Sequence, residues 1–289
     1  STGEVMALAS YPTFDNRWFN SGISGDKFSE IFPKTDDPDK SLLVNRAIQG
    51  QYNLGSSFKP FVAFAALDTG QLPGGEDYYY LDQGEYTLVS IDKETCQMIK
   101  CIYRNALCGG GNYACRYGRV NVEDALAVSS DTFFYKIGEE IFSERGGQPI
   151  LQEEVRKFGF GSSTGIDLPF ESAGRVPDKE SKKKLVESGV LMEGESTNYL
   201  VGDNVQLSVG QGLLAASPLQ LAQAYGALAN GGDVNRPLIA LALLEPGTPN
   251  SDQVGVADLT KAVVALNLGT KDTIRNLSID PAVLDPIVR

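Results

Sequence analysis

An apolar stretch that begins just after Ser56 constrains the fold more than any other feature of the sequence. Its residues recur with the spacing of a helix, and Gly70 and Pro73 then provide a helix end. Gly55 permits a sharp entry, and Lys59 lies one helical turn after Ser56. We therefore predict a helix that starts near Ser56 and buries the stem of Lys59. The apolar residues of this helix are Phe61, Val62, Phe64, Ala65, Ala66 and Leu67.

Three further helices are expected on the C-terminal side of this one. Asn121 is typical of a helix N-cap, and acidic residues follow it in the first turn. The run Ser129-Ser130-Asp131 interrupts that helix, and the next has a core stripe of Phe133, Phe134 and Ile137. The last begins at Ser217-Pro218 with Gln220 in its first turn, and it ends at residues 230–232.

Strand signals are fewer than helix signals. Residues 4–10 form a short apolar run that predicts a buried strand, and residues 86–89 are a second candidate. Lys182, Lys183 and Lys184 are interpreted as a solvated run in a polar loop. No internal repeat and no linker divides the chain, so we expect residues 1–289 to belong to one domain.

The composition excludes several classes of function. Lys and Arg number 25 and Asp and Glu 37, which gives a net charge of −12. Such a chain repels phosphate backbones and anionic lipid, so no nucleic-acid partner is expected. Histidine is absent, which removes Ser-His-Asp, Cys-His and histidine-ligated metal mechanisms. Any nucleophilic catalysis must therefore use another base. No apolar run approaches the roughly 20 residues of a membrane span.

Four cysteines fall within one window of the sequence: Cys96, Cys101, Cys108 and Cys115. Their spacing does not match the paired ligands of a zinc ribbon. Disulfide bonds, free thiols and a metal site remain alternatives, with disulfides favoured. Disulfides would indicate an oxidising compartment, and four cysteines allow three connectivities that the sequence does not rank.

A serine one helical turn from a lysine is an alternative to a histidine-activated nucleophile. The pattern occurs four times, and the pair Ser56/Lys59 alone precedes an apolar helix that would lower the lysine pKa by burial. In the simpler interpretation, Ser56 is an N-cap and Lys59 a surface residue. Ser129 and Asp131 likewise predict either a proton relay with an orienting carboxylate or a helix end followed by an Asp N-cap. The other three pairs are Ser24/Lys27, Ser90/Lys93 and Ser181/Lys184.

Four ordered blocks resemble the transpeptidase domain of class B penicillin-binding proteins. The nucleophile segment is similar to residues 45–61 (NRAIQGQYNLGSSFKPF), and the second motif is similar to residues 125–135 (ALAVSSDTFFY). A characteristic loop resembles residues 164–174 (TGIDLPFESAG). The last block resembles residues 210–232, with GQG, SPLQLA and ANGG in order. Asp131, where many relatives have Asn, is more similar to the elongation-type branch, penicillin-binding protein 2.

The resemblance implies an α+β fold of the penicillin-binding and serine β-lactamase type. In it Ser56 is the acylated nucleophile, Lys59 its proton acceptor, Ser129 the proton relay, and Asp131 a group that binds the lysine or the substrate. The implied substrate is a stem peptide ending in D-Ala-D-Ala, and β-lactams would acylate the same serine. A membrane glycosyltransferase is the implied partner, at the extracytoplasmic side of the bacterial plasma membrane. No metal or organic cofactor is implied.

One motif of the family does not occur in the sequence. The nearest strings to Lys-Thr/Ser-Gly begin at Lys34, Lys40 and Lys271, and none of them fits. In relatives this strand supplies the second oxyanion N–H and a binding edge for the substrate. The chain also opens at Ser1 without a start Met or a signal-like core. We therefore expect a fragment with a largely present helical subdomain and an incomplete antiparallel sheet, inactive by itself, without pedestal, anchor and C-terminal strands.

Two other functions remain open from the sequence. A serine β-lactamase or β-lactam sensor domain shares the fold and the serine chemistry, and differs in how fast it deacylates. A non-catalytic scaffold of a cell-wall synthesis complex belongs to another class of protein. The missing third motif favours that scaffold, whereas Ser56, Lys59 and Ser129 favour an enzyme.

Overall fold

Short helices are the main regular structure in a computed structural model that describes residues 2–20, 22–34, 41–98, 101–109, 111–192, 194–245 and 264–289. The 3-10 helices are η1 (Asn16–Phe19), η3 (Gly55–Phe58) and η4 (Gly75–Asp77). The α-helices are α1 (Gly25–Ile31), α2 (Lys59–Asp68), α3 (Lys93–Met98), α4 (Val122–Ala127), α5 (Asp131–Glu144), α6 (Ile150–Lys157), α7 (Lys179–Glu187), α8 (Val201–Leu207), α9 (Pro218–Ala229) and α10 (Pro281–Val288).

The strands pair two by two, and each pair is antiparallel. The strands are β1 (Tyr80–Asp82), β2 (Glu85–Thr87), β3 (Ile102–Arg104), β4 (Gly118–Val120), β5 (Asp233–Asn235), β6 (Ala242–Leu244), β7 (Val264–Asn267) and β8 (Thr273–Asn276). Their pairs are β1 with β4, β2 with β3, β5 with β8, and β6 with β7. In the β1–β4 pair, Tyr80 lies opposite Val120 and Asp82 opposite Gly118. Helices with short antiparallel strands confirm the predicted α+β class.

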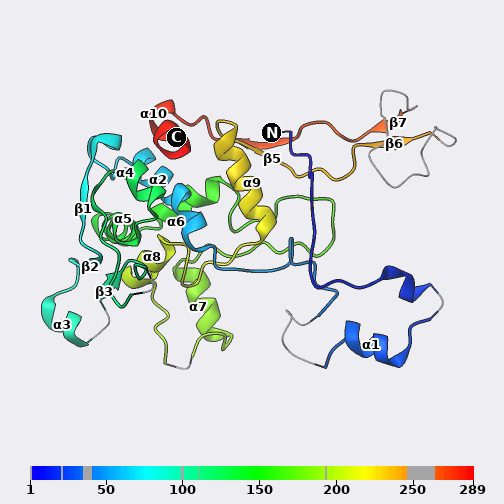
Figure 1. The fold of residues 1–289 in the computed structure, drawn as a ribbon, viewed down its shortest axis with the longest axis horizontal. Helices are drawn as coiled ribbons and strands as arrows, with labels where there is room; N and C mark the ends of the chain where they lie inside the picture. Colours follow the sequence, from blue (N-terminus) through cyan, green and yellow to red (C-terminus); the bar gives the residue numbers. More distant parts are fainter. Residues whose placement is uncertain are drawn as a thin grey trace.

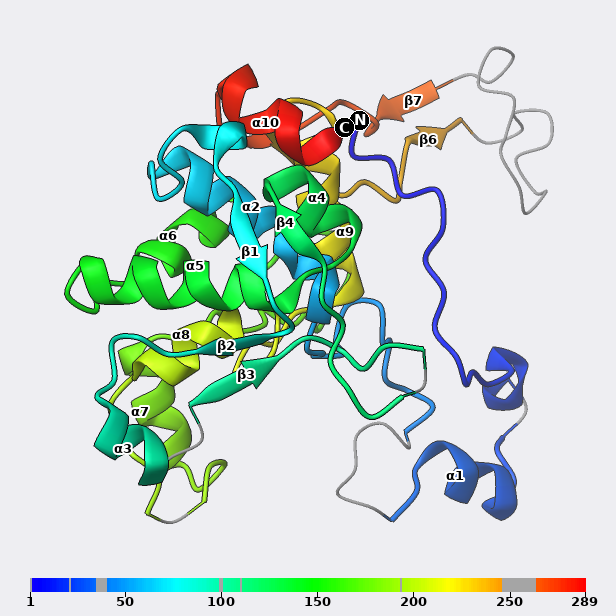
Figure 2. The ribbon, with the colours of Figure 1, turned by 60° about the vertical axis from the view of Figure 1, so that its left-hand side comes forward.

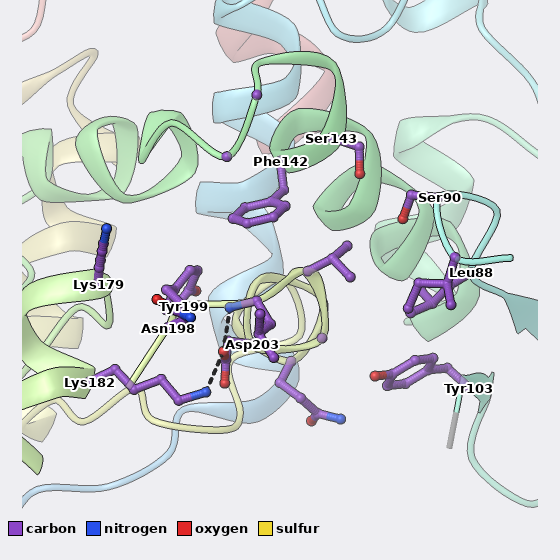
Figure 3. Close-up of a pocket in the computed structure, with 17 residues that line it drawn as sticks. Leu88, Ser90, Tyr103, Phe142, Ser143, Lys179, Lys182, Asn198, Tyr199 and Asp203 are labelled. Carbon is purple, nitrogen blue, oxygen red and sulfur yellow. Dashed lines mark hydrogen bonds and ion pairs between the residues drawn. The ribbon is translucent and has the colours of Figure 1, made fainter. Parts of the chain in front are cut away.

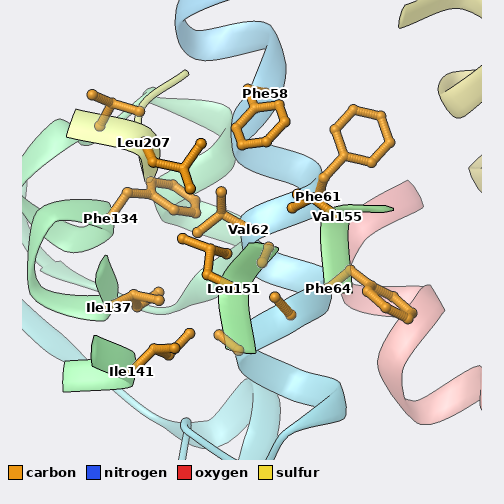
Figure 4. Packing of buried hydrophobic residues seen from close by; sticks show 14 of the residues in the cluster. Phe58, Phe61, Val62, Phe64, Phe134, Ile137, Ile141, Leu151, Val155 and Leu207 are labelled. Atoms are coloured by element: carbon orange, nitrogen blue, oxygen red, sulfur yellow. The ribbon is translucent and has the colours of Figure 1, made fainter. Parts of the chain in front are cut away.

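Helix α2 lies at the centre of the hydrophobic core (Figure 4). All its residues from Phe61 to Ala66 are buried, because neighbouring helices cover it on several sides. The ring of Phe61 packs edge-on against Phe158 and Phe160, with centroid distances of 5.1 and 4.9 Å. The other helices contribute Phe134, Ile137 and Ile141 from α5, Leu151 and Val155 from α6, and Leu207 from α8.

The predicted helix ends follow local capping chemistry. Asn121 and Asp124 form a capping box at α4, and Ser217 and Gln220 form another at α9. The interpretation of Asp131 as an N-cap is wrong, because the Ser130 side chain caps α5 by accepting a bond from Phe133 N–H. Asp131 is therefore the first residue of α5, where its carboxylate is available for other contacts.

Some strand pairs pack against this helical body, whereas others, and the N-terminal segment, lie apart from it. The pairs β1–β4 and β2–β3 lie beside α5, whereas β6 and β7 project away from the helices (Figures 1 and 2). Helix α1 also lies apart from the helical body in both views. The part of the molecule that positions the predicted site residues is therefore the body around α2.

Two predictions about individual segments are wrong. Residues 4–10 are not a buried strand: the structure gives a parallel bridge between Glu4 and Leu238, and Met6 is 89% exposed. One bridge does not pair the backbone along the segment or cover its side chains. The lysine run does not lie in a loop but in α7, which leaves Lys183 and Lys184 exposed as predicted. Lys182 is not solvated, because α7 directs it toward Asp203, 2.7 Å away, and only 5% of the residue is exposed. Within the described residues, no helix is both long and apolar enough to cross a membrane.

Candidate active site

Ser56 lies in the 3-10 turn η3, where its side chain is exposed. Two close contacts fix this turn from the C-terminal half of the chain. Gly55 N–H donates to the Gly210 carbonyl at 2.9 Å, and Tyr225 on α9 donates its hydroxyl to the Ser57 carbonyl at 2.8 Å. A Cβ at Gly210 would lie 2.3 Å from the Gly55 oxygen, so this approach requires glycine.

The Ser56 carbonyl has a hydrogen-bond partner although Pro60, four residues further on, has no N–H to donate. The N–H of Lys59 donates to the Ser56 carbonyl instead, which is the i to i+3 bond of a 3-10 turn. This tighter turn precedes α2, where Pro60 occupies the first turn and needs no donor. The local sequence therefore places Ser56 at the entry to α2 with its carbonyl satisfied.

Lys59 is buried, and its ammonium reaches the break between α4 and α5. Only 1% of Lys59 is exposed. Its Nζ donates to Ser129 Oγ at 2.9 Å, to the Ser129 carbonyl at 2.8 Å and to Asp131 Oδ1 at 2.6 Å. Three acceptors match the three protons of an ammonium group. The structure thus brings Lys59, Ser129 and Asp131 together, and it does not support a surface position for Lys59.

The environment of Lys59 acts on its pKa in two directions. Burial lowers the pKa below the ordinary value of 10.5, because the charged form loses its hydration. The hydrogen bond to Asp131 and the charge of that carboxylate raise it, and burial is the larger effect. The site therefore favours the neutral amine more than water does, while a carboxylate still binds the group.

Ser129 has a backbone conformation that is rare for its residue type. Its φ angle is +56°, in the left-handed region that favours glycine. This conformation follows the end of α4 and precedes the cap of α5, so the chain turns sharply between the two helices. The turn presents both the hydroxyl and the carbonyl of Ser129 to Lys59.

The other serine–lysine pairs serve local roles in the structure. Ser24 caps α1, and Lys27 is an exposed partner of Glu30. Ser181 completes a capping box, and Lys184 is exposed beside Glu180. For the remaining pair, Ser90 donates to Glu139, and the Lys93 side chain lies outside the described part of the chain.

The four cysteines form two disulfides in the structure, between Cys96 and Cys101 and between Cys108 and Cys115. Each disulfide joins cysteines that are adjacent among the four in the sequence. Both lie in the segment between α2 and α4. In the described ranges of the chain, no cluster of histidine, cysteine, aspartate or glutamate is suited to a metal ion.

Sequence patterns did not single out two buried polar residues beside the site. Asp82 ends β1 with 1% exposure, and Asn105 follows β3 with 4% exposure. The two residues are hydrogen-bonded to each other, and each is also hydrogen-bonded to the segment that follows Ser129. Aspartate and asparagine in loops usually indicate turns, so no local signal distinguished them.

A cavity of about 1110 Å³ opens between α5, α7 and α8, and neither Asp82 nor Asn105 lines it (Figure 3). Figure 3 shows the ion pair of Lys182 and Asp203 in it, together with Tyr103, Phe142 and Tyr199. None of the four predicted site residues lines this cavity. This cavity is therefore distinct from the group of residues around Lys59.

Comparison with known proteins identifies the family. A family model described as the penicillin binding protein transpeptidase domain matches residues 1–267. The peptidoglycan D,D-transpeptidase MrdA of Escherichia coli K12 is 33% identical over 246 residues, covering 85% of this chain and 34% of that protein. MrdA of Acinetobacter baumannii is 33% identical over 239 residues, covering 80% and 29%.

Solved structures agree with this assignment. Pseudomonas aeruginosa PBP2 in complex with WCK 5153 has a TM-score of 0.68 and 29% identity, covering 98% of this chain and 52% of that one. Helicobacter pylori PBP2 in a complex with MreC has a TM-score of 0.63 and 29% identity, covering 81% and 37%.

The chain belongs to the penicillin-binding protein transpeptidase-domain family. Within that family it is similar to the penicillin-binding protein 2 branch, as the motifs predicted. It spans about a third of the length of the curated relatives it matches.

Proposed function

We propose that this chain is the nucleophile-bearing part of a serine D,D-transpeptidase that cross-links peptidoglycan. One observation carries the proposal: a buried lysine, one turn after an exposed serine, binds Ser129 and Asp131. Family membership supports the same chemistry, because relatives at 33% identity are named peptidoglycan D,D-transpeptidases. In this proposal residues 1–289 form part of a single transpeptidase domain.

Ser56 acts as the nucleophile in the first step. Its Oγ attacks the carbonyl carbon of the penultimate D-Ala of a stem peptide ending in D-Ala-D-Ala. Neutral Lys59 accepts the hydroxyl proton, and the burial that lowers the Lys59 pKa favours this neutral form. The Ser56 N–H, at the start of the helical segment, stabilises the oxyanion that develops on the substrate.

Ser129 transfers the proton onward when the tetrahedral intermediate collapses. The peptide bond to the terminal D-Ala breaks, and the departing amine takes a proton from Lys59 through the Ser129 hydroxyl, 2.9 Å from Nζ. An amine of a neighbouring strand then attacks the Ser56 ester, and its proton returns to the site as Ser56 leaves. One peptide bond is broken and one is formed, so no oxidant or organic cofactor takes part. Asp131 keeps Lys59 aligned throughout.

The proposed setting is the extracytoplasmic side of the bacterial plasma membrane, in the cell envelope. Two disulfides suit an oxidising compartment outside the cytoplasm. β-Lactams are proposed to acylate the same serine, and a membrane glycosyltransferase is the proposed partner. Helicobacter pylori PBP2, a similar structure, has been solved as a complex with MreC, which supports a role within an assembly.

Labelling with fluorescent penicillin tests the acylation step. This chain and a version extended at its C-terminal end by the family's Lys-Thr-Gly strand would be incubated with the probe and separated on a denaturing gel. We expect labelling of the extended version that is lost in Ser56→Ala. Lys59→Ala should also lose labelling while the thermal unfolding transition stays cooperative.

The outcomes separate this function from its alternatives. Rapid release of the label with turnover of penicillin would show a β-lactamase in place of a transpeptidase. No labelling of either form, with both folded, would overturn the serine mechanism and favour a scaffold role. A label that survives Ser56→Ala would contradict the choice of nucleophile.

A further inference from the structure

A buried carboxylate lies directly behind the segment that binds Lys59. Asp82, at the end of β1, accepts a 2.5 Å hydrogen bond from the Ser130 hydroxyl and a 2.8 Å bond from Gly84 N–H. Asn105 Nδ2 donates to the two carboxylate oxygens of Asp82 at 2.9 and 2.8 Å. Three donor groups thus converge on one side chain that is only 1% exposed.

Asn105 extends this network into the first turn of α5. Its Oδ1 accepts from the Thr132 N–H at 2.9 Å, while its own backbone N–H donates to the Gly84 carbonyl at 3.1 Å. Ser130 and Thr132 are both fully buried. The network therefore connects Ser130 and Thr132, on either side of Asp131, to Asp82 and Asn105, which lie 48 and 27 positions earlier in the sequence.

Ser130 stands between the two residues that bind Lys59. Its backbone follows Ser129, whose φ of +56° is unfavourable for a residue with a side chain. Such a conformation persists only where the surroundings determine it. The hydroxyl of Ser130 contacts Asp82 and also caps α5, so it fixes the chain on the C-terminal side of Ser129.

We propose that Asp82 and Asn105 are positioning residues for acylation, which hold Ser129 and Asp131 in the geometry that binds Lys59. The proposal rests on the proposed function of Ser56 and Lys59. Neither residue touches Lys59, so each acts through Ser130 and Thr132.

The loop that carries Asn105 is itself fixed. Asn105 Nδ2 also donates to the Cys115 carbonyl at 2.9 Å, and Cys115 N–H donates to the Ala106 carbonyl at 2.9 Å. Gly84 lets the Cys115 carbonyl approach, since a Cβ there would lie 2.9 Å from that oxygen. The pairs β1–β4 and β2–β3 beside α5 bring these loops together (Figure 2).

Glu139, on α5, provides a control for Asp82. It is also a buried carboxylate at 1% exposure, and it accepts bonds from Tyr86 Oη, Ser90 N–H and Ser90 Oγ. Its partners lie in and after β2, not beside Ser129. Asp82 and Glu139 thus have similar burial and hydrogen bonding but different connections to the site, whereas Ser130 is fully buried and Ser90 is exposed.

The test compares Asp82→Asn and Ser130→Ala with Glu139→Gln and Ser90→Ala, in this chain and in the version extended by the Lys-Thr-Gly strand. Fluorescent penicillin gives the acylation rate constant and the dissociation constant of the non-covalent complex separately. We expect acylation to slow about 10- to 100-fold in the first pair, because small misplacements of reacting groups have effects of this size. The dissociation constant should change less than about twofold, as expected for groups that act on the transition state.

Hydrogen–deuterium exchange supplies a readout that needs no acylation. Asp82→Asn and Ser130→Ala should speed exchange in residues 129–133, including the Thr132 amide that donates to Asn105. Glu139→Gln and Ser90→Ala should speed exchange near residues 86–90 and leave 129–133 unchanged. Ser130→Ala removes only one hydroxyl, so it is the smaller change. If Asp82→Asn does not fold, Ser130→Ala is the variant on which the test is made.

The two readouts distinguish the failure of this proposal from the failure of the proposed function. Equal losses of acylation in both pairs of variants would overturn the positioning role, because stability alone would then explain them. Unchanged exchange at 129–133 in Ser130→Ala would also overturn it. If the wild-type forms do not label at all, the proposed function fails, and the exchange of residues 129–133 alone decides whether Asp82 and Ser130 order this segment.

Discussion

At the residue scale, the proposed role of Lys59 as proton acceptor requires two properties that oppose each other. A proton acceptor must be neutral, and burial in the core favours that form. A positioned amine needs partners, and Asp131 at 2.6 Å favours the charged form. Burial is the larger effect, so the lysine pKa lies below 10.5 even with the carboxylate present. In the proposed mechanism, the balance between burial and the Asp131 carboxylate sets the pH at which acylation becomes fast.

Asp131→Asn should move the acidic limb of acylation to lower pH. The rate rises with pH as Lys59 loses its proton, so the midpoint of the rise follows the pKa of Lys59. Removing the carboxylate removes the hydrogen bond and charge that raise this pKa, and burial then lowers it further. The measurement is the second-order acylation rate constant with fluorescent penicillin across the neutral and alkaline range.

Glu140→Gln is the matched control for this prediction. Glu140 also lies on α5 and pairs with a lysine, Lys136, but it does not contact Lys59. Its midpoint should equal that of the wild type. A midpoint that rises in Asp131→Asn, or that moves equally in both variants, would contradict the assignment of Lys59 as proton acceptor.

At the element scale, the turn at Ser56 depends on a close approach between two distant backbone segments. Gly210→Ala would place a Cβ 2.3 Å from the Gly55 oxygen and 2.7 Å from Phe58 Cβ, so η3 must shift. We expect acylation to slow about 10- to 100-fold, because the turn carries Ser56, the proposed nucleophile. The positive φ of Gly210 adds a cost of about 1–2 kcal/mol in the free energy of unfolding.

Gly70→Ala separates these two effects. Gly70 has a φ of +70°, close to the +69° of Gly210, but an added Cβ would meet nothing within 4 Å. This variant should lose a similar backbone contribution to stability and keep its acylation rate. Chemical denaturation and penicillin labelling measure the two quantities. A Gly210→Ala protein that acylates as fast as Gly70→Ala would show that the approach does not position Ser56.

The two disulfides should differ in their effect on the site. Replacing Cys108 and Cys115 by serine removes the closure of a short loop, with an expected loss of about 2–3 kcal/mol in unfolding free energy. The loop includes the Cys115 carbonyl that accepts from Asn105, so acylation should also slow. Replacing Cys96 and Cys101 should cost a similar stability without slowing acylation. Equal acylation rates in the two double variants would contradict this difference.

Sequence patterns predicted the elements that local chemistry determines. The capping boxes of α4 and α9 depend on residues within one helical turn of each other. The contacts that sequence reasoning missed join distant residues: Ser130 lies 48 positions from Asp82, and Lys182 lies 21 from Asp203. No local pattern encodes such pairs, because packing of whole elements brings them together.

At the scale of the whole molecule, residues 1–289 contain the lysine side of the proposed site. The sequence contains no Lys-Thr-Gly or Lys-Ser-Gly triplet. By resemblance, this strand provides the second N–H donor to the oxyanion and an edge for the substrate backbone. The described helices place Lys59, Ser129 and Asp131 together without it. In the proposed mechanism, positioning of the proton acceptor and stabilisation of the oxyanion are therefore separable.

Adding the Lys-Thr-Gly strand should raise the acylation rate of this chain by about 10²–10³, the usual effect of one oxyanion donor. The comparison needs three proteins: the chain itself, the extended chain, and an extended chain whose triplet is replaced by three alanines. The alanine version retains the added strand and its packing. It therefore distinguishes the effect of the strand's backbone N–H groups on the acylation rate from the effect of the triplet's side chains. If the original chain acylates as fast as the extended one, the oxyanion donors already lie within residues 1–289, and the assignment of the missing strand is wrong. If the alanine version restores the full rate, the strand acts through its backbone edge, which is the role that an N–H donor to an oxyanion requires.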